Sequence, residues 1–209
     1  MKSYYTISEN SDGIYEEKRS KFIAKATHIE SENEAKEILL KTKKEYYDAR
    51  HNCYAYVLGE DKKKQKFFDD GEPSGTAGAP IMEAIKKSDL TNILITVTRY
   101  FGGIKLGAAG LTRAYNKAAN IAVENAKIVK METFFNVSLT IDYNLLSSVE
   151  YYLRKENITI KTSDYNEKVD MNILVLTEKI EKVKKDIIDL SSGKINIEYI
   201  GEELVAIDI

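Results

Sequence analysis

Two glycine-rich segments have the residue types best suited to binding chemistry: Gly71 to Gly78 and Gly102 to Gly110. Each precedes a predicted helix. The first N–H groups of a helix have no partner within it, and the helix dipole favours negative charge there, so each segment could hold a phosphate-like anion. The composition is equally compatible with glycines that only form tight turns. Neither segment is a P-loop or a dinucleotide-binding fingerprint.

The second segment lies in a basic stretch. From Arg99 to Lys130 there are six Lys or Arg residues and one acidic residue, Glu124. Such a stretch is usually a solvated face, but beside glycines it is a candidate anion site. Arg113, placed in the first turn of the predicted helix, would cost about 0.3 to 1 kcal/mol against the dipole unless an anion compensates. The predicted anion- or nucleic-acid-binding residues are Arg99, Gly102, Gly103, Lys105, Gly107, Gly110, Arg113 and Lys117, with Ser74, Gly75 and Thr76 from the first segment.

Two further groups of side chains could do chemistry. Asp69, Asp70 and Glu72 could hold a magnesium ion or act as an acid and base pair, since hard cations need several oxygen ligands. Adjacent acids also commonly form turns and cap helices. His51 and Cys53 point to the same side of a predicted strand and could act as base and nucleophile, although a buried cysteine is usually inert. We assign no catalytic residue.

The elements that position these residues alternate between strands and helices up to about residue 130. The clearest are a buried strand, Asn92 to Thr98, and a helix whose apolar stripe runs from Leu111 to Ala126. The other expected elements are strand-like 13–29, a helix over 32–47, a strand over 53–58, a charged loop over 60–66 and a helix entered near Pro80.

From Phe135 the pattern changes to one-sided strands separated by two amphipathic helices. The strands are indicated by alternating apolar residues and the helices by apolar residues at helical spacing. The predicted strands lie near 135–141, 158–160, 171–175 and 195–199, and the helices at 145–156 and 178–190. The order βαββαβ predicts a ferredoxin-like unit.

The whole chain of 209 residues is 43% hydrophobic and 31% charged, which is typical of globular proteins. We expect an α+β protein of two α/β-sandwich modules, residues 1–132 and 133–209. Residues 1–134 carry 22 Lys or Arg against 19 Asp or Glu, and residues 135–209 carry 9 against 14. The chain lacks a long apolar run, a signal-peptide core and a second cysteine, so we expect a cytoplasmic protein without a membrane partner or a disulfide. No cofactor is predicted, and the oligomeric state stays open.

Three motifs resemble the signature segments of the IMPACT/YigZ family: HNCYAYVLG (His51 to Gly59), DDGEPSGTAGAPI (Asp69 to Ile81) and VTRYFGGIKLGAAGLTRAY (Val97 to Tyr115). The resemblance covers residues 1–130, and the remainder is similar to the ferredoxin-like second domain of bacterial members and to a terminal domain of elongation factor G. It implies a ribosomal-protein-like βαβ superfold for the first module. One departure is Ala109, where family members often have glycine. The matching positions are Asp69, Asp70, Gly71, Glu72, Ser74, Gly75 and Thr76, and Arg99, Gly102, Gly103, Lys105, Gly107, Gly110 and Arg113.

The resemblance also implies, for eukaryotic relatives, regulation of translation through a protein kinase activator. Three hypotheses about function follow. The first is a non-catalytic, translation-associated regulator that binds RNA, the ribosome or a translation factor through the basic glycine-rich surface. The second is a metal-dependent enzyme acting on a phosphorylated small molecule. The third is a protein-interaction regulator that binds no RNA and docks its partner through the acidic second module.

Overall fold

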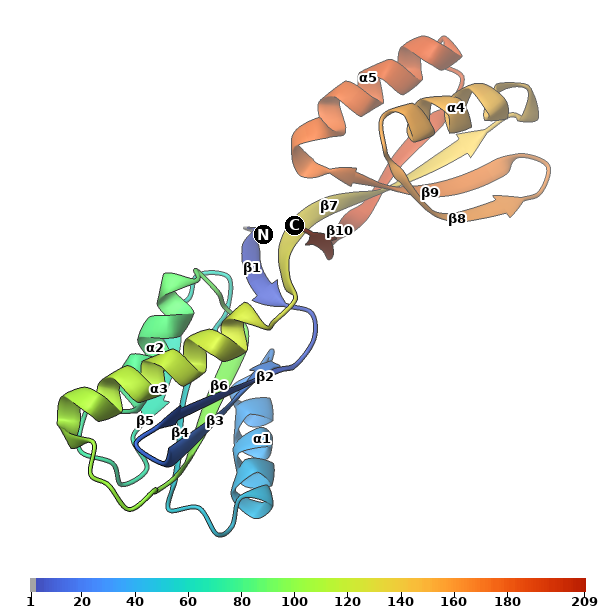
Figure 1. The fold of residues 1–209 in the computed structure, drawn as a ribbon. Coiled ribbons are helices and arrows are strands. Elements are labelled where there is room, and N and C mark those ends of the chain that lie inside the picture. The colour runs from blue at the N-terminus through green and yellow to red at the C-terminus, as the bar shows by residue number, and fades with distance from the viewer. Residues whose placement is uncertain (1–2) are drawn as a thin grey trace. The chain divides into compact units, whose positions relative to one another are not determined.

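The computed structural model describes residues 3–209, which form two compact units. The first unit comprises residues 3–131 together with Ala206–Ile209, and the second comprises Glu132–Val205 (Figure 1). Both mix helices with a β-sheet, so the α+β prediction is confirmed. The expected division after residue 132 differs from this one chiefly in the last four residues, which group with the first unit. None of the helices in residues 3–209 has the length and apolarity needed to cross a membrane.

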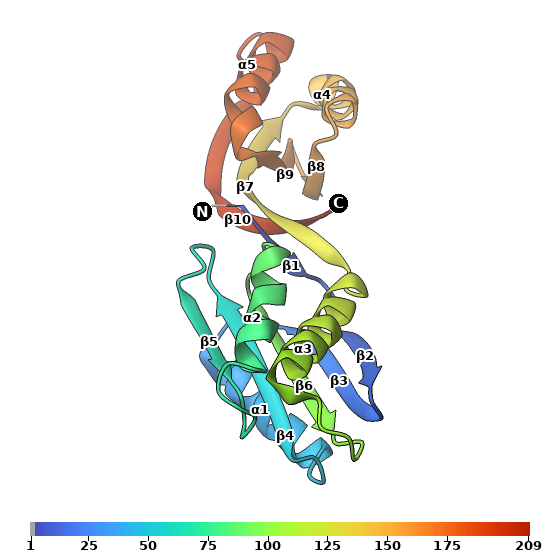
Figure 2. The ribbon, with the colours of Figure 1, turned by 60° about the vertical axis from the view of Figure 1, so that its left-hand side comes forward.

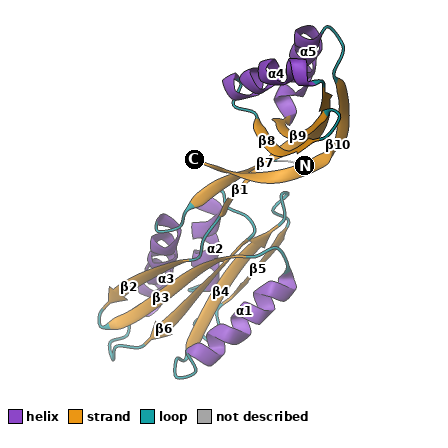
Figure 3. Ribbon diagram, turned by 90° about the vertical axis from the view of Figure 1, so that its right-hand side faces the viewer, coloured by secondary structure: helices purple, strands orange, loops and turns teal. Residues whose placement is uncertain are grey.

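The first unit contains a five-stranded sheet in the order β2-β3-β6-β4-β5, in which every neighbouring pair is antiparallel. Figure 3 shows α1 on one face of this sheet and α2 and α3 on the other. The elements are β1 (Tyr4–Ile7), β2 (Ser11–Glu17), β3 (Ser20–His28), α1 (Glu32–Glu45), β4 (His51–Leu58), β5 (Lys64–Phe68), α2 (Gly78–Lys87), β6 (Ile93–Tyr100) and α3 (Gly107–Glu124).

The connections in this unit are split βαβ units. Strands β3 and β4 are both antiparallel to β6, so they run parallel to each other, and α1 connects them across β6. By the same reasoning β5 and β6 are parallel, with β4 between them and α2 as their connection. This arrangement brings the loop before α2 and the loop before α3 to the same end of the sheet.

Two expectations for this unit are wrong in detail. The strand-like stretch 13–29 is a hairpin of β2 and β3, turning at Lys18 and Arg19, whose φ angles are 47° and 67°. Such a turn usually contains glycine or asparagine, and Lys18 and Arg19 carry no comparable turn signal. The charged loop expected over 60–66 contains the start of β5, which pairs with β4.

The central strands of this sheet are covered on both faces, which explains why β6 is buried along almost its whole length. Residues of α2 and α3 pack with Phe22, Ala24, Cys53, Ile95 and Val97 into the larger core. On the opposite face α1 covers a smaller cluster. The smaller cluster contains Ile29, Ala35, Tyr56, Leu58 and Leu94. A central strand covered on both sides needs no polar face, as predicted for Asn92 to Thr98.

The second unit has the predicted order βαββαβ. Its elements are β7 (Ile128–Ile141), α4 (Tyr143–Lys155), β8 (Thr159–Tyr165), β9 (Val169–Leu176), α5 (Ile180–Ser191) and β10 (Asn196–Asp208), with a short 3₁₀ turn at Thr177–Lys179. The strand order β10-β7-β9-β8 is that of a ferredoxin-like sheet. Strand β7 begins in the first unit, where Ile128 to Met131 pair with β1, a strand that was not predicted.

Candidate anion-binding site

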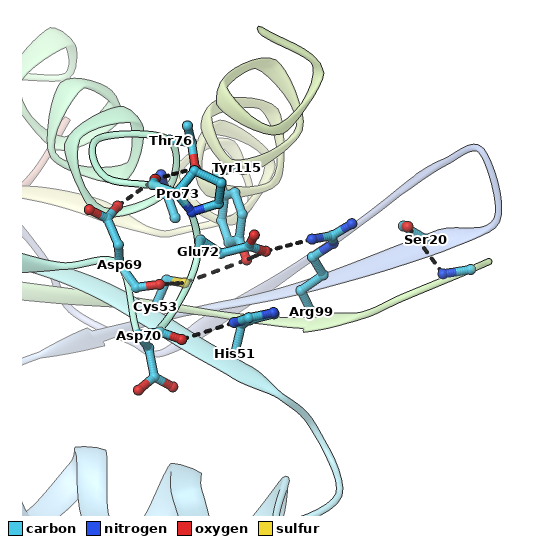
Figure 4. Close-up of polar contacts among 12 residues, drawn as sticks. Ser20, His51, Cys53, Asp69, Asp70, Glu72, Pro73, Thr76, Arg99 and Tyr115 are labelled. Carbon is cyan, nitrogen blue, oxygen red and sulfur yellow. Dashed lines mark hydrogen bonds and ion pairs between the residues drawn. The ribbon is translucent and has the colours of Figure 1, made fainter. Parts of the chain in front are cut away.

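A buried polar network joins the loop before α2 to β6 and α3. The Arg99 guanidinium donates through Nη1 to Glu72 Oε1 at 2.7 Å, with side chains 8% and 3% exposed (Figure 4). The Tyr115 hydroxyl donates to the same oxygen at 2.8 Å. Burial, with the neighbouring Cys53 and Glu72, raises the pKa of Tyr115 far above its ordinary value, so this hydroxyl stays a donor. The network fixes the Glu72 loop against the end of β6.

Cys53 belongs to the inner side of this network. Its thiol is fully buried, and its single proton has two acceptors within reach, the Asp69 carbonyl oxygen at 2.9 Å and the Tyr115 hydroxyl at 3.5 Å from Sγ. Burial raises the pKa of Cys53 to about 12. A nucleophilic cysteine needs a lowered pKa and access to its substrate, so the pairing of His51 and Cys53 as base and nucleophile has no support in this geometry.

The three carboxylates of the acidic motif have separate partners. The Asp69 carboxylate accepts from the N–H groups of Gly75, Ala77 and Gly78 at 2.8 to 3.0 Å. The Asp70 carboxylate accepts from the Asn52 N–H at 2.7 Å, and Glu72 belongs to the buried network. Within residues 3–209 no group of three or more His, Cys, Asp or Glu side chains is placed to hold a metal ion. The magnesium site expected at Asp69, Asp70 and Glu72 has no support in this geometry, because the three carboxylates do not converge.

The first glycine-rich segment has its helix start occupied by a carboxylate of the chain, that of Asp69. Asp69 takes the N–H groups of Gly75, Ala77 and Gly78, which a phosphate at the start of α2 would need. The Thr76 hydroxyl donates to the Pro73 carbonyl oxygen at 2.7 Å. The expectation that Ser74, Gly75 and Thr76 bind an external anion has no support in this geometry, because the Asp69 carboxylate already lies at this helix start.

The second glycine-rich segment leaves the start of α3 without a cap. The residue before the helix, Leu106, makes no side-chain hydrogen bond to it. Gly102 and Gly110 have packing roles. A Cβ at Gly102 would lie 2.0 Å from the Arg19 backbone carbon, and one at Gly110 would lie 3.1 Å from the Leu106 Cβ. Gly103 and Gly107 have φ angles of 85° and 71°, which favour glycine.

Arg113 and Lys117 lie apart from this helix start. Because α3 begins at Gly107, Arg113 is in its second turn, and the expected dipole penalty of a first-turn position does not apply. Both side chains are exposed, and the Lys117 ammonium lies 5.0 Å from the ring centre of Tyr15 on β2. They form a second basic surface on α3 toward β2.

A pocket of about 410 Å³ lies between the start of β4, the loop before α2, the end of β6 and the start of α3. It collects three basic side chains, Arg50, Arg99 and Lys105, and the uncapped start of α3. The buried Nε of Arg99 has no hydrogen-bond partner within residues 3–209. The lining consists of Arg50, His51, Glu72, Pro73, Arg99, Phe101, Lys105, Leu106, Gly107, Ala108 and Leu111. Ala109, the departure from the family pattern, is exposed and is not among these residues.

His51 enters the pocket with a defined tautomer. Its Nδ1 lies 2.9 Å from the Asp70 carbonyl oxygen, which can only accept, so Nδ1 carries the proton. In the neutral ring Nε2 is then an acceptor, and in the charged ring it is a donor. The Phe101 ring, 54% exposed, lies beside Arg99, whose Cζ is 5.6 Å from the ring centre. Sequence reasoning missed Arg50, which directly precedes the first motif, and Phe101, which lies within the third motif.

The fold and this pocket define a two-unit α+β protein whose first unit has a pocket lined by basic side chains at one end of its sheet. The model of the Impact N-terminal domain matches residues 18–123, and a model described as Domain of unknown function (DUF1949) matches residues 139–194. The chain belongs to the IMPACT family. It is 38% identical to IMPACT family member YvyE of Bacillus subtilis (strain 168) over 197 residues, covering 94% of this chain and 91% of the relative.

Other relatives agree with this assignment. IMPACT family member YigZ of Escherichia coli (strain K12) is 32% identical over 191 residues, covering 90% of this chain and 94% of the relative. A Protein IMPACT homolog of Dictyostelium discoideum is 37% identical over 109 residues, covering 50% of this chain and 31% of that protein. A crystal structure of a hypothetical protein is similar, with a TM-score of 0.62, 30% identity and coverage of 96% and 98%.

Proposed function

We propose that this protein is a non-catalytic, translation-associated regulator whose first unit binds RNA, free or within the ribosome, at the pocket before α3. One observation carries the proposal. Arg50, Arg99 and Lys105 line one pocket together with the uncapped start of an 18-residue helix. Phosphate groups bind to such combinations of N–H groups and basic side chains.

The charges in the pocket favour an anion even though one of them is already compensated. Arg99 is neutralised by Glu72 at 2.7 Å and adds little net charge to the pocket. Arg50 and Lys105 are exposed and supply uncompensated positive charge.

Two residues favour RNA over a simple phosphate. Phe101 has an exposed ring on which a base can stack, and such stacking contributes about 1 to 3 kcal/mol per base. His51 lines the same pocket, and its unprotonated Nε2 could accept a hydrogen bond from a ribose 2′-hydroxyl. A phosphorylated small molecule is the second candidate, because a pocket of about 410 Å³ is large enough for one.

The test is binding of single-stranded RNA and of ribosomes across a salt series. The variant Arg50→Glu/Lys105→Glu changes two exposed pocket residues and keeps the buried pair intact. We expect it to lose binding and to lower the slope of log K against log salt by about 0.7 for each lost phosphate contact. The matched control is Lys185→Glu/Lys194→Glu, with two exposed lysines of the second unit.

A third variant, Arg113→Glu/Lys117→Glu, measures whether the RNA extends along α3 toward β2. Equal losses in the pocket variant and in the Lys185→Glu/Lys194→Glu control would reject the pocket as the site. If wild type binds no RNA but is stabilised by phosphorylated metabolites, the second candidate replaces the first. If neither ligand class binds, the protein-interaction hypothesis is favoured.

A further inference from the structure

Strand β5 forms an open edge of the sheet in the first unit. In the part of the chain that the structure describes, β5 pairs with β4 alone, and all five of its residues are exposed. Figure 2 shows β5 at the border of the sheet, with no further strand beyond it. An edge strand presents a row of N–H and C=O groups that can pair with another extended chain.

Apolar pockets lie on both sides of this edge. A pocket of about 530 Å³ between α1, β4 and β5 is lined by Leu39, Leu40, Tyr54 and Phe68 among others. A second pocket, of about 470 Å³, lies between β5 and α2 and includes Phe67, Ala79 and Met82. Successive residues of a strand point to opposite faces, so Phe67 and Phe68 serve one pocket each. They remain 50% and 47% exposed.

The charge around both pockets is positive. Lys36, Lys43 and Lys66 line the first pocket, and Lys86 and Lys87 line the second. Glu83 is the one acidic residue in either lining. Lys43 has Asp70 at 3.5 Å, whereas no ion pair involves the other four lysines within the described chain. A ligand that fills these pockets is therefore favoured when it carries negative charge beside its apolar groups.

We propose that the β5 edge binds an extended segment of a partner protein in which two adjacent apolar residues are flanked by acidic residues. The segment adds to the sheet as a sixth strand. Its backbone pairs with β5, its two apolar side chains enter the pockets on opposite faces, and its carboxylates lie near the lysines. This surface is separate from the pocket before α3 and does not depend on it.

The pattern distinguishes this partner from a second copy of the same strand. Lysines on an edge strand commonly prevent pairing between identical chains, because like charges then lie opposite one another. Phe67 and Phe68, which are half exposed on the same edge, instead favour pairing with an apolar strand. The lysines and the phenylalanines together make the edge selective for an acidic, apolar strand and unfavourable for another β5.

The experiment uses a fluorescein-labelled peptide, Glu-Thr-Glu-Phe-Phe-Glu-Thr-Glu, and fluorescence anisotropy with the full chain. We expect saturable binding that weakens about tenfold or more in Lys66→Glu/Lys86→Glu, since that variant replaces attraction by repulsion on both faces. Binding to the Lys185→Glu/Lys194→Glu control should stay within about twofold of wild type. Both variants change exposed side chains, and their folds are checked by circular dichroism.

Modified peptides test the strand geometry without changing the protein. N-methylation of one alternate set of peptide N–H groups should abolish binding, and methylation of the other set should leave it intact, because only one set faces β5. Equal binding of a peptide with lysines in place of glutamates, equal tolerance of both methylations, or no binding at millimolar peptide would overturn the proposal. The proposal would also be overturned if Lys66→Glu/Lys86→Glu lost RNA binding but kept peptide binding.

Discussion

Arg99 Nη1 lies 2.7 Å from Glu72 Oε1 in a nearly solvent-free position, and this ion pair joins the acidic motif to the strand that ends at the second glycine-rich loop. Removing one member of a buried pair leaves an uncompensated charge. We therefore expect Glu72→Ala to lower the free energy of unfolding of the first unit by about 3 to 5 kcal/mol in urea unfolding. Glu83→Ala, at an exposed position, is the control. A loss under about 1 kcal/mol would show that Arg99 is compensated without Glu72.

Removing the Asp69 carboxylate should open the start of α2. Three N–H groups lose their acceptor in Asp69→Ala, so we expect a loss of stability of about 2 kcal/mol and faster amide exchange at Gly75, Ala77 and Gly78. Hydrogen exchange followed by NMR measures both. Asp61→Ala, which removes a surface carboxylate, should leave these amides unchanged; unchanged exchange in Asp69→Ala itself would refute the capping role.

Two neighbouring glycines should respond differently to alanine. At Gly102 a Cβ would lie 2.0 Å from the Arg19 backbone carbon, whereas at Gly103 the space is open and only the φ of 85° disfavours a side chain. We expect Gly103→Ala to lose about 1 kcal/mol and Gly102→Ala at least twice as much, in urea unfolding. The reverse order would mean that the turn at Arg19 moves away easily.

The Cys53 thiol should react slowly and should make stability depend on alkaline pH. Burial raises the pKa of Cys53 from 9.0 to about 12, so the folded protein holds this proton where the unfolded chain has lost it. Its contribution to stability is complete below pH 9 and falls as pH rises from 9 toward 12. Thiol labelling at pH 8 should require unfolding, and Cys53→Ala should flatten the decline in stability above pH 9. Fast labelling of folded protein would contradict this.

Pyrophosphate offers a simpler probe of the pocket than RNA. It should raise the melting temperature of wild type in a concentration-dependent way, because a ligand that binds only the folded state stabilises it. We expect Arg50→Glu/Lys105→Glu to lose this response and Lys185→Glu/Lys194→Glu to keep it. The same rise in all three proteins would indicate a general salt effect.

Local patterns predicted the regular elements of the fold but missed pairing between distant segments. The apolar run in β6 and the stripe on α3 are each visible within one segment. Strand β1 pairs with Ile128 to Met131, more than a hundred residues away, and no local pattern reveals such a partner. The lysines at the start of β5 resemble a loop in the sequence, because both faces of an edge strand can be polar.

Some of the residues that the sequence analysis grouped together also lie together in the fold. Arg99, Lys105 and Gly107 do line one pocket. The role of Asp69 could not be predicted, because the same residue type, aspartate, serves both to cap helices and to bind metal ions. Arg113 was misplaced by one turn because the apolar stripe of α3 begins at Leu111, whereas the helix begins at Gly107. Arg50 lines the pocket because the start of β4 lies beside the loops before α2 and α3. The sequence alone does not specify that these segments are neighbours.

The Asp69 cap has a consequence for how the two helix starts respond to the medium. A carboxylate held by the chain itself acts at an effective concentration of about millimolar or more, and it remains in place when the solution changes. Free anions therefore compete poorly at the start of α2, whereas the start of α3 has no side-chain cap within residues 3–209. We therefore expect added phosphate to bind at the start of α3 and not at the start of α2. Of two loops with similar composition, one is then capped by the chain itself and the other is open to a ligand from solution.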